Sequence, residues 1–120
     1  AYGMLVVWKH DTPIGIVYLR PTDLILRQAM LGFDLLPEYQ NQGYGTEAVR
    51  AAIDYIERSS NLVKITAGTF SDKPASRRVL EKAGMTYIGT DRKFWFKGDH
   101  WKDGDRFEYL LNPEAVPASE

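Results

Sequence analysis

The glycine-rich stretch QNQGYG, residues 40–45, combines residue types and a position that suit a ligand with phosphate groups. It lies between a short apolar run and a helical pattern. The N-terminus of a helix leaves its first N–H groups unpaired and carries a partial positive charge, so it suits a phosphate. Glycine lets the backbone approach such a ligand because it has no Cβ atom. A lone Gly-x-Gly is a weak signal, and the stretch predicts either a phosphate-binding loop or a plain tight turn.

Residue types exclude several other kinds of site. No Gly-Lys-Ser/Thr follows the glycines and no third glycine completes a dinucleotide fingerprint, so neither of those nucleotide loops is predicted. The chain has no cysteine, which excludes disulfides, thiolate metal ligands and a cysteine nucleophile. His10 and His100 fall in turn-like segments without a ligand pattern, so we expect no bound metal.

The composition indicates one domain without a strongly charged surface. The 120 residues include 15 Lys and Arg against 16 Asp and Glu, a formal net charge of -1. Nucleic-acid binding would need a clustered basic excess, so no nucleic-acid partner is expected. No run has the length of a membrane span and no signal segment opens the chain, so we expect a cytoplasmic protein without a membrane partner.

A strand and a helix must hold the glycine loop between them. The apolar run at residues 31–36 predicts a strand that Pro37 ends, since proline cannot donate to a sheet ladder. After the loop, apolar residues recur at helical spacing while charged residues face away. These apolar residues are Ala48, Val49, Ala52, Ile53 and Ile56. Residues 31–56 are therefore predicted to run strand, loop and helix.

Two β-rich runs precede this unit. Residues 4–8 and 14–19 are separated by a turn-like segment and predict a hairpin. Pro21 is expected to break the second strand, and residues 24–29 fit either a strand extension or a loop.

The unit is followed by one more helix and three strands. Residues 62–70 alternate as a strand, and residues 71–74 predict a helix start with a capping side chain and an early proline. Residues 85–96 and 106–111 predict two strands, joined by residues 97–104 as a polar turn.

The order β-β-β-α-β-α-β-β predicts an α/β (α+β) fold with a mixed, mostly antiparallel sheet and two helices. Residues 1–111 are the expected domain. Residues 112–120, with two prolines and small or acidic residues, are an expected flexible tail.

Two motifs resemble one known family. Residues 37–48, PEYQNQGYGTEA, resemble the acetyl-CoA signature Q/R-x-x-G-x-G/A of the GNAT superfamily of acyl-CoA N-acyltransferases, closest to its ribosomal-protein N-terminal acetyltransferase branch. Residues 73–85, KPASRRVLEKAGM, look like the second motif of that family, which runs N-x-x-S-x-r-v-l-e-K-x-G-F/M. The resemblance covers most of the chain, and the first strand and first two helices of the family fold are expected to be absent.

The resemblance implies acetyl-CoA as cosubstrate. In the family the loop amides hold the CoA pyrophosphate, and the preceding strand splays from its neighbour to admit the pantetheine arm. That strand also supplies a backbone N–H for the oxyanion, here near Leu35. The implied cofactor-binding residues are Phe33, Asp34, Leu35, Gln40, Asn41, Gln42, Gly43, Tyr44, Gly45 and Thr46.

The second motif departs from the family at two positions. Lys73 stands where an asparagine helps to hold the pantetheine, and Leu80 stands where a tyrosine protonates the departing thiolate. In the ribosomal-protein branch a serine is proposed for that role, and it corresponds to Ser76. Ser76 is therefore the candidate catalytic residue, with a non-catalytic early-helix serine as an equal alternative, and no general base is assigned.

These features predict an N-acetyltransferase that moves an acetyl group from acetyl-CoA to a primary amine, either a protein N-terminus or a small amine. The alternative is a non-catalytic acyl-CoA-binding module or an inactive relative, which Lys73, Leu80 and the expected absence of the early helices favour. The amine acceptor itself is unknown.

Three surface features leave alternatives open. Phe94-Trp95-Phe96 with Trp101 fits either an acceptor pocket or ordinary core and hairpin packing. Arg77 and Arg78 fit either a CoA phosphate contact or a solvated helix surface. An exposed edge at the first strand favours a homo-oligomer, or else a chain that is part of a longer product.

Overall fold

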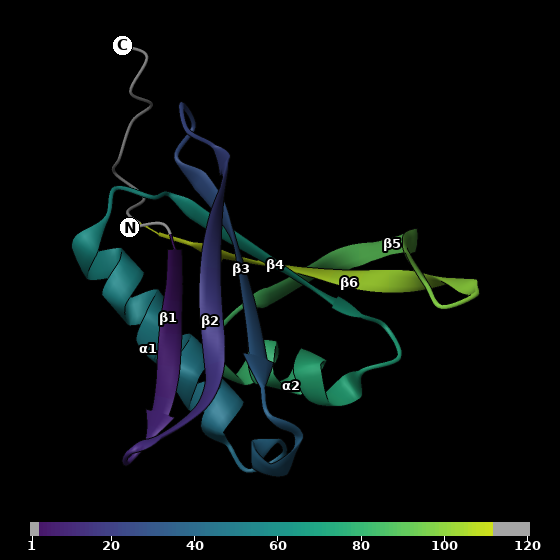
Figure 1. Cartoon of the computed structure of the whole chain (residues 1–120). Helices are drawn as coiled ribbons and strands as arrows, with labels where there is room; N and C mark the ends of the chain where they lie inside the picture. Colours follow the sequence, from purple (N-terminus) through teal and green to yellow (C-terminus); the bar gives the residue numbers. More distant parts are fainter. Residues whose placement is uncertain (1–2, 112–120) are drawn as a thin grey trace.

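The computed structural model describes residues 3–111 and shows one continuous six-stranded sheet with two helices (Figure 1). The element order is the predicted one, with a short 3-10 helix added after the third strand. The elements are β1 (Gly3–Lys9), β2 (Thr12–Asp23), β3 (Gln28–Leu35), η1 (Pro37–Tyr39), α1 (Tyr44–Ser59), β4 (Lys64–Phe70), α2 (Pro74–Lys82), β5 (Thr86–Lys97) and β6 (His100–Leu110). The predicted tail, residues 112–120, lies outside the described residues.

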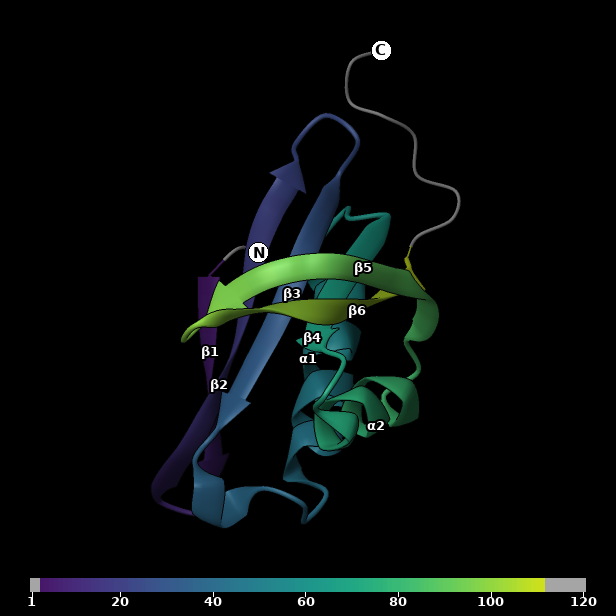
Figure 2. The ribbon, with the colours of Figure 1, turned by 90° about the vertical axis from the view of Figure 1, so that its right-hand side faces the viewer.

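The sheet is mixed and mostly antiparallel, as predicted. Its strand order is β1-β2-β3-β4-β6-β5, and the single parallel pair joins β3 to β4 at the centre. That pair is short: the register runs from Gln28 opposite Lys64 to Met30 opposite Thr66. Beyond it the two strands separate, and β4 turns away toward β6 and β5 (Figures 1 and 2). The expected splay of the central strand is therefore present.

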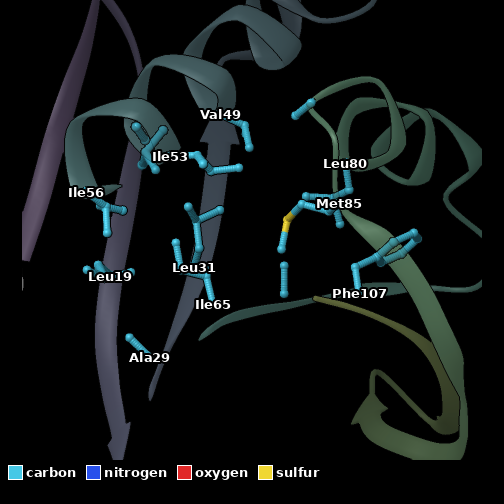
Figure 3. Packing of buried hydrophobic residues seen from close by; sticks show 14 of the residues in the cluster. Leu19, Ala29, Leu31, Val49, Ile53, Ile56, Ile65, Leu80, Met85 and Phe107 are labelled. Carbon is cyan, nitrogen blue, oxygen red and sulfur yellow. The ribbon is translucent and has the colours of Figure 1, made fainter. Parts of the chain in front are cut away.

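One apolar cluster joins both helices to the sheet (Figure 3). Val49, Ile53 and Ile56 project from α1 toward the strands, at the predicted helical spacing. Ile65 of β4 and Phe107 of β6 are fully buried in the same cluster. Burial of each such side chain stabilises the fold by about 1.5–3 kcal/mol, so the core holds the start of α1 close to the end of β3.

The prediction that Pro21 breaks the second strand is wrong. β2 continues through Pro21, which pairs with Ala29 of β3, and the register shifts only between Pro21 and Asp23. Among residues 3–111, the pairing of β1 with β2 reaches Leu19, and Pro21 has a partner on β3 alone. Proline is tolerated at such a position because no neighbour in this part of the chain needs its missing N–H. Residues 24–27 then form a turn, which settles the alternative left open for residues 24–29.

The predicted polar turn at residues 97–104 is also much shorter than expected. Lys97 pairs with His100 and Phe96 with Trp101, so only Gly98 and Asp99 connect β5 to β6. Gly98 has φ 69°, which suits the first central residue of a two-residue hairpin turn. The polar residues between His100 and Gly104 belong to the strand, where pairing with β5 overrides their turn-like composition.

The second helix begins at Pro74, but without the predicted capping side chain. The hydroxyl of Ser71 donates instead to the carboxylate of Asp105 at 2.9 Å. The helix ends at a glycine: Gly84 has φ 100°, its N–H donates to Glu81 O, and the N–H of Met85 donates to Leu80 O. This pair of bonds is a Schellman motif, which satisfies the last carbonyl groups of the helix.

The two edges of the sheet are β1 and β5. On β1 the large apolar side chains of Met4, Leu5, Val6 and Trp8 are exposed. Neither helix in residues 3–111 has the length and apolar character that a membrane crossing requires.

Candidate functional site

A cavity of about 660 Å³ lies where β3 and β4 separate, bounded by the glycine loop and by α2. Most of the residues predicted to bind the cofactor line it, together with Ser76. These residues are Phe33, Asp34, Leu35, Gln40, Asn41, Gly43, Gly45, Thr46 and Ser76. Gln42 and Tyr44 belong to the loop but do not line the cavity.

The glycine loop presents backbone rather than side chains at the start of α1. Gly43 is the N-cap residue with φ 88°, and no side chain caps this helix end. The first helical bond runs from Glu47 N to Gly43 O, so the N–H groups of residues 44–46 precede the helical ladder. A Cβ atom added to Gly43 would meet no atom within 4 Å, which leaves open space for a ligand above the backbone.

The polar side chains of the loop bond within the loop and to β3. Gln40 Nε2 donates to Leu35 O at 3.0 Å, and Gln42 Nε2 donates to Glu38 O at 2.8 Å. Because these amides hold the loop in place, they are already engaged, and the surface left for an anion comprises Asn41 and the backbone of Gly43 to Thr46.

A lysine and two tyrosines hold the outer side of the loop to β1. Lys9 Nζ lies 5.1 Å from the ring centre of Tyr44 and 5.8 Å from that of Tyr39, and the two rings meet edge to face. A hydrogen bond with Tyr44 raises the pKa of Lys9 above its usual 10.5. This contact explains why Tyr44 faces away from the cavity.

The backbone of β3 faces the cavity beyond the last pair with β4. The N–H of Leu36 donates to Ile14 O of β2 at 2.9 Å. N–H and C=O groups alternate in direction along an antiparallel strand, so Leu35 and Phe33 direct theirs away from β2. The bond from Gln40 to Leu35 O agrees with this direction. The N–H of Leu35 therefore points to the side where β4 has diverged.

Ser76 and Leu80 lie one helical turn apart on α2 but in different surroundings. Leu80 is 1% exposed and belongs to the core, whereas Ser76 is half-buried. Both line a second cavity of about 90 Å³ between β3, β4 and α2, and Ser76 also lines the large one. Within residues 3–111 the hydroxyl of Ser76 has no protein hydrogen-bond partner, so it is free for a ligand.

The cavity is lined by more positive than negative charge. Lys73, Arg78, Lys82 and Lys97 line it, and Asp34 is the single acidic residue among its described lining. Arg78 and Lys82 are four residues apart and so share one face of α2. Arg77 lies elsewhere: it is 3.5 Å from the carboxylate of Asp105 and its guanidinium lies 4.6 Å from the ring centre of Tyr87. Arg77 therefore contacts other side chains outside the cavity, and a CoA phosphate contact stays a prediction for Arg78 alone.

The aromatic side chains of the last hairpin lie in different surroundings, and an acceptor pocket there stays a prediction. Phe94 lines the cavity, whereas Phe96 packs edge to face on Trp101 at 5.4 Å as a cross-strand pair. Trp95 is 60% exposed.

Several lining residues escaped the sequence analysis, notably Tyr18, Phe70, Lys82 and Lys97. Tyr18 pairs with Gly32 across β2 and β3, a relation that depends on strand register. Lys82 could have been found from its spacing to Arg78. Lys97 of β5 lies 5.2 Å from the ring centre of Phe70 of β4, although β6 separates the two strands in the sheet, and no local pattern reveals this contact.

Comparison with known proteins gives a consistent result. The sequence profile described as Acetyltransferase (GNAT) domain matches residues 1–86. The probable N-acetyltransferase YjcK of Bacillus subtilis is 36% identical over 89 residues, which are 74% of this chain and 49% of that protein. The ribosomal-protein-serine acetyltransferase of Escherichia coli is 22% identical over 92% of this chain and 62% of its own length.

Solved structures agree with these matches. Spermidine N-acetyltransferase from Vibrio cholerae, in complex with CoA and spermine, superposes with a TM-score of 0.82 at 25% identity. The superposition covers 90% of this chain and 64% of that one. The chain thus spans between 38% and 65% of the length of the proteins it matches. The profile match over most of the chain, with the split sheet and the glycine loop at the start of α1, shows that the chain belongs to the GNAT family of acetyltransferases.

Proposed function

We propose that the chain transfers an acetyl group from acetyl-CoA to a primary amine by direct attack in a ternary complex. The observation that carries this proposal is the single cavity that joins the glycine loop, the diverged edge of β3 and the start of α2. In this cavity, one extended ligand could reach both an anion-binding helix N-terminus and an open strand edge.

The basic lining supports acetyl-CoA as the ligand. The backbone N–H groups of Gly43 to Thr46 would hold the pyrophosphate, with Arg78 and Lys82 on the facing side of α2. The pantetheine arm of acetyl-CoA would run along β3 past Phe33 and Leu35. The same loop and the same cosubstrate are implied by the sequence motif, and the structure of the Vibrio cholerae relative contains CoA.

The chemistry requires an oxyanion site and a partner for the departing thiolate. A neutral amine attacks the thioester carbon, and the N–H of Leu35 would stabilise the oxyanion that forms. The hydroxyl of Ser76 would hydrogen-bond the sulfur as negative charge develops on it, an interaction stronger in the transition state than in the ground state. Leu80 lies in the core and has no proton to give.

The class of amine that accepts the acetyl group can be tested directly. Relatives are named for ribosomal-protein serine and for spermidine, so peptides with an N-terminal serine and spermidine are the natural first probes. Release of CoA thiol should depend on one of these amines. Tight binding of acetyl-CoA without release on any amine would instead support a non-catalytic acyl-CoA-binding module.

We also propose that the protein self-associates through β1. This edge strand exposes a row of apolar side chains, and an unpaired edge is a template for pairing with a second copy.

A further inference from the structure

β3 and β4, the two strands that separate at the cavity, carry glycines at matching positions. An aromatic ring covers each of these glycines. The parallel register pairs Gln28 with Lys64, and the same offset places Gly32 level with Gly68. A Cβ atom on Gly32 would overlap the Cζ and hydroxyl of Tyr18 from β2. A Cβ atom on Gly68 would lie 3.4 Å from the ring of Phe94 from β5. Because neither glycine has a Cβ atom, an aromatic ring can cover each side of the gap between β3 and β4.

Tyr18 approaches the opening from the face that carries neither α1 nor α2. Its neighbours Val17 and Leu19 are buried in the core beneath the helices. Side chains alternate along a strand, so Tyr18 points to the other face. Its ring crosses Gly32 toward β4, and it lines the 90 Å³ cavity together with Ser76. Tyr18 and Ser76, each with a hydroxyl group, therefore line this small cavity from opposite faces of the sheet.

The Tyr18 hydroxyl is free for chemistry. Within residues 3–111 it has no protein hydrogen-bond partner, and the residue is 37% exposed. A phenol is a much stronger acid than an aliphatic hydroxyl, so it is better suited than serine to give up a proton. Position 80, where the family motif has a tyrosine, carries a buried leucine in this chain.

We propose that Tyr18 is a second catalytic residue, which transfers protons between the acceptor amine and the departing sulfur. The inference rests on the proposed acetyl transfer. The amine nitrogen forms a bond to the thioester carbon, and the carbon–sulfur bond breaks. The sulfur takes the proton of Tyr18, and the phenolate then takes the proton that the positively charged nitrogen must lose. The products are an acetylated amine and free CoA thiol, and Tyr18 is restored.

The test is Tyr18→Phe, which keeps the ring over Gly32 and removes only the hydroxyl. We expect kcat to fall about 100-fold, the range of general acid–base catalysis, with no change in the Kd for acetyl-CoA. Tyr55→Phe is the matched control, because Tyr55 is an exposed tyrosine on the outside of α1. It should keep the parent's kcat. Turnover would be followed with spermidine and with a peptide that begins with serine.

The outcomes separate this inference from the proposed function. A parent protein that turns over, with a Tyr18→Phe variant of equal kcat, would overturn the role of Tyr18 alone. A variant that loses acetyl-CoA affinity but keeps kcat would also overturn it, because the ring contact would then be structural. A parent with no turnover on either amine would overturn the proposed function and this role with it.

Discussion

At the scale of single residues, the candidate site depends on the exposed backbone of the glycine loop, because the loop's side chains make contacts elsewhere. Gln40 bonds to β3, Gln42 bonds within the loop, and Tyr44 contacts Lys9 of β1. Gly43 adopts a left-handed conformation that places the next N–H groups at the cavity. The side chains of the loop therefore shape the site, and the backbone supplies the contacts.

Substitution of the two loop glycines should abolish acetyl-CoA binding. Gly43→Val forces a β-branched residue to φ 88°, and Gly45→Asp adds a carboxylate beside the phosphates, with its Cβ 3.2 Å from Val79. Calorimetry with acetyl-CoA would measure the loss. Gly98→Val is the control, since Gly98 also has positive φ but lies in the hairpin turn outside the cavity. Unchanged affinity in both loop variants would contradict the assignment of the loop.

Ser76→Ala should lower kcat and leave the affinity for acetyl-CoA nearly unchanged. The hydroxyl would act on the sulfur only as charge develops, so we expect a loss of about 10- to 1,000-fold. Steady-state kinetics with matched calorimetry would separate the two quantities. Ser59→Ala, at the far end of α1, is the control. Equal turnover of Ser76→Ala and the parent would leave Ser76 with a structural role only.

At the scale of elements, the start of α2 is held by a buried acid on β6 instead of by a helix cap. Asp105 is 4% exposed and accepts bonds from Ser71 at 2.9 Å and Thr90 at 2.8 Å, with Arg77 at 3.5 Å. Lys102 bonds to Asp72 at 2.7 Å in the same region. These contacts fix where Lys73 and Ser76 meet the cavity.

Asp105→Ala should therefore destabilise the protein, because three donors lose a buried acceptor. We expect the free energy of unfolding to fall by about 3 kcal/mol, as measured by urea denaturation. The control is Asp91→Ala, whose ion pair with Arg106 spans 3.6 Å and is half exposed on both sides. That change should cost less than about 1 kcal/mol. Equal losses in the two variants would show that Asp105 does not anchor α2.

The element scale is also where sequence-based prediction was most and least successful. The apolar spacing of Val49, Ile53 and Ile56 predicted α1 because a helix buries one face whatever lies opposite. The extent of β2 past Pro21 and of β6 back to His100 could not be predicted, since both depend on which neighbour a strand has. Tyr18 could not be predicted for the same reason, because its place beside the gap between β3 and β4 depends on its register with Gly32.

At the scale of the whole molecule, the exposed edge strand predicts self-association. Met4, Val6 and Trp8 are 64%, 49% and 59% exposed on β1. Sedimentation velocity should show a species that grows with protein concentration, and Val6→Lys should suppress it, because an edge lysine opposes pairing. Ile25→Lys is the control, since Ile25 is an exposed apolar residue in a turn. A parent that stays monomeric at every concentration would count against this proposal.

The central claim is that one cavity brings acetyl-CoA and an amine together for direct transfer. Its most direct test is the initial rate of CoA thiol release with both substrates varied, using a thiol reagent. The chain contains no cysteine, so the protein itself gives no background. The account predicts release that requires the amine and double-reciprocal lines that intersect, as a ternary complex demands. Acetyl-CoA binding with no amine-dependent release, across spermidine and peptides with N-terminal serine, would contradict it.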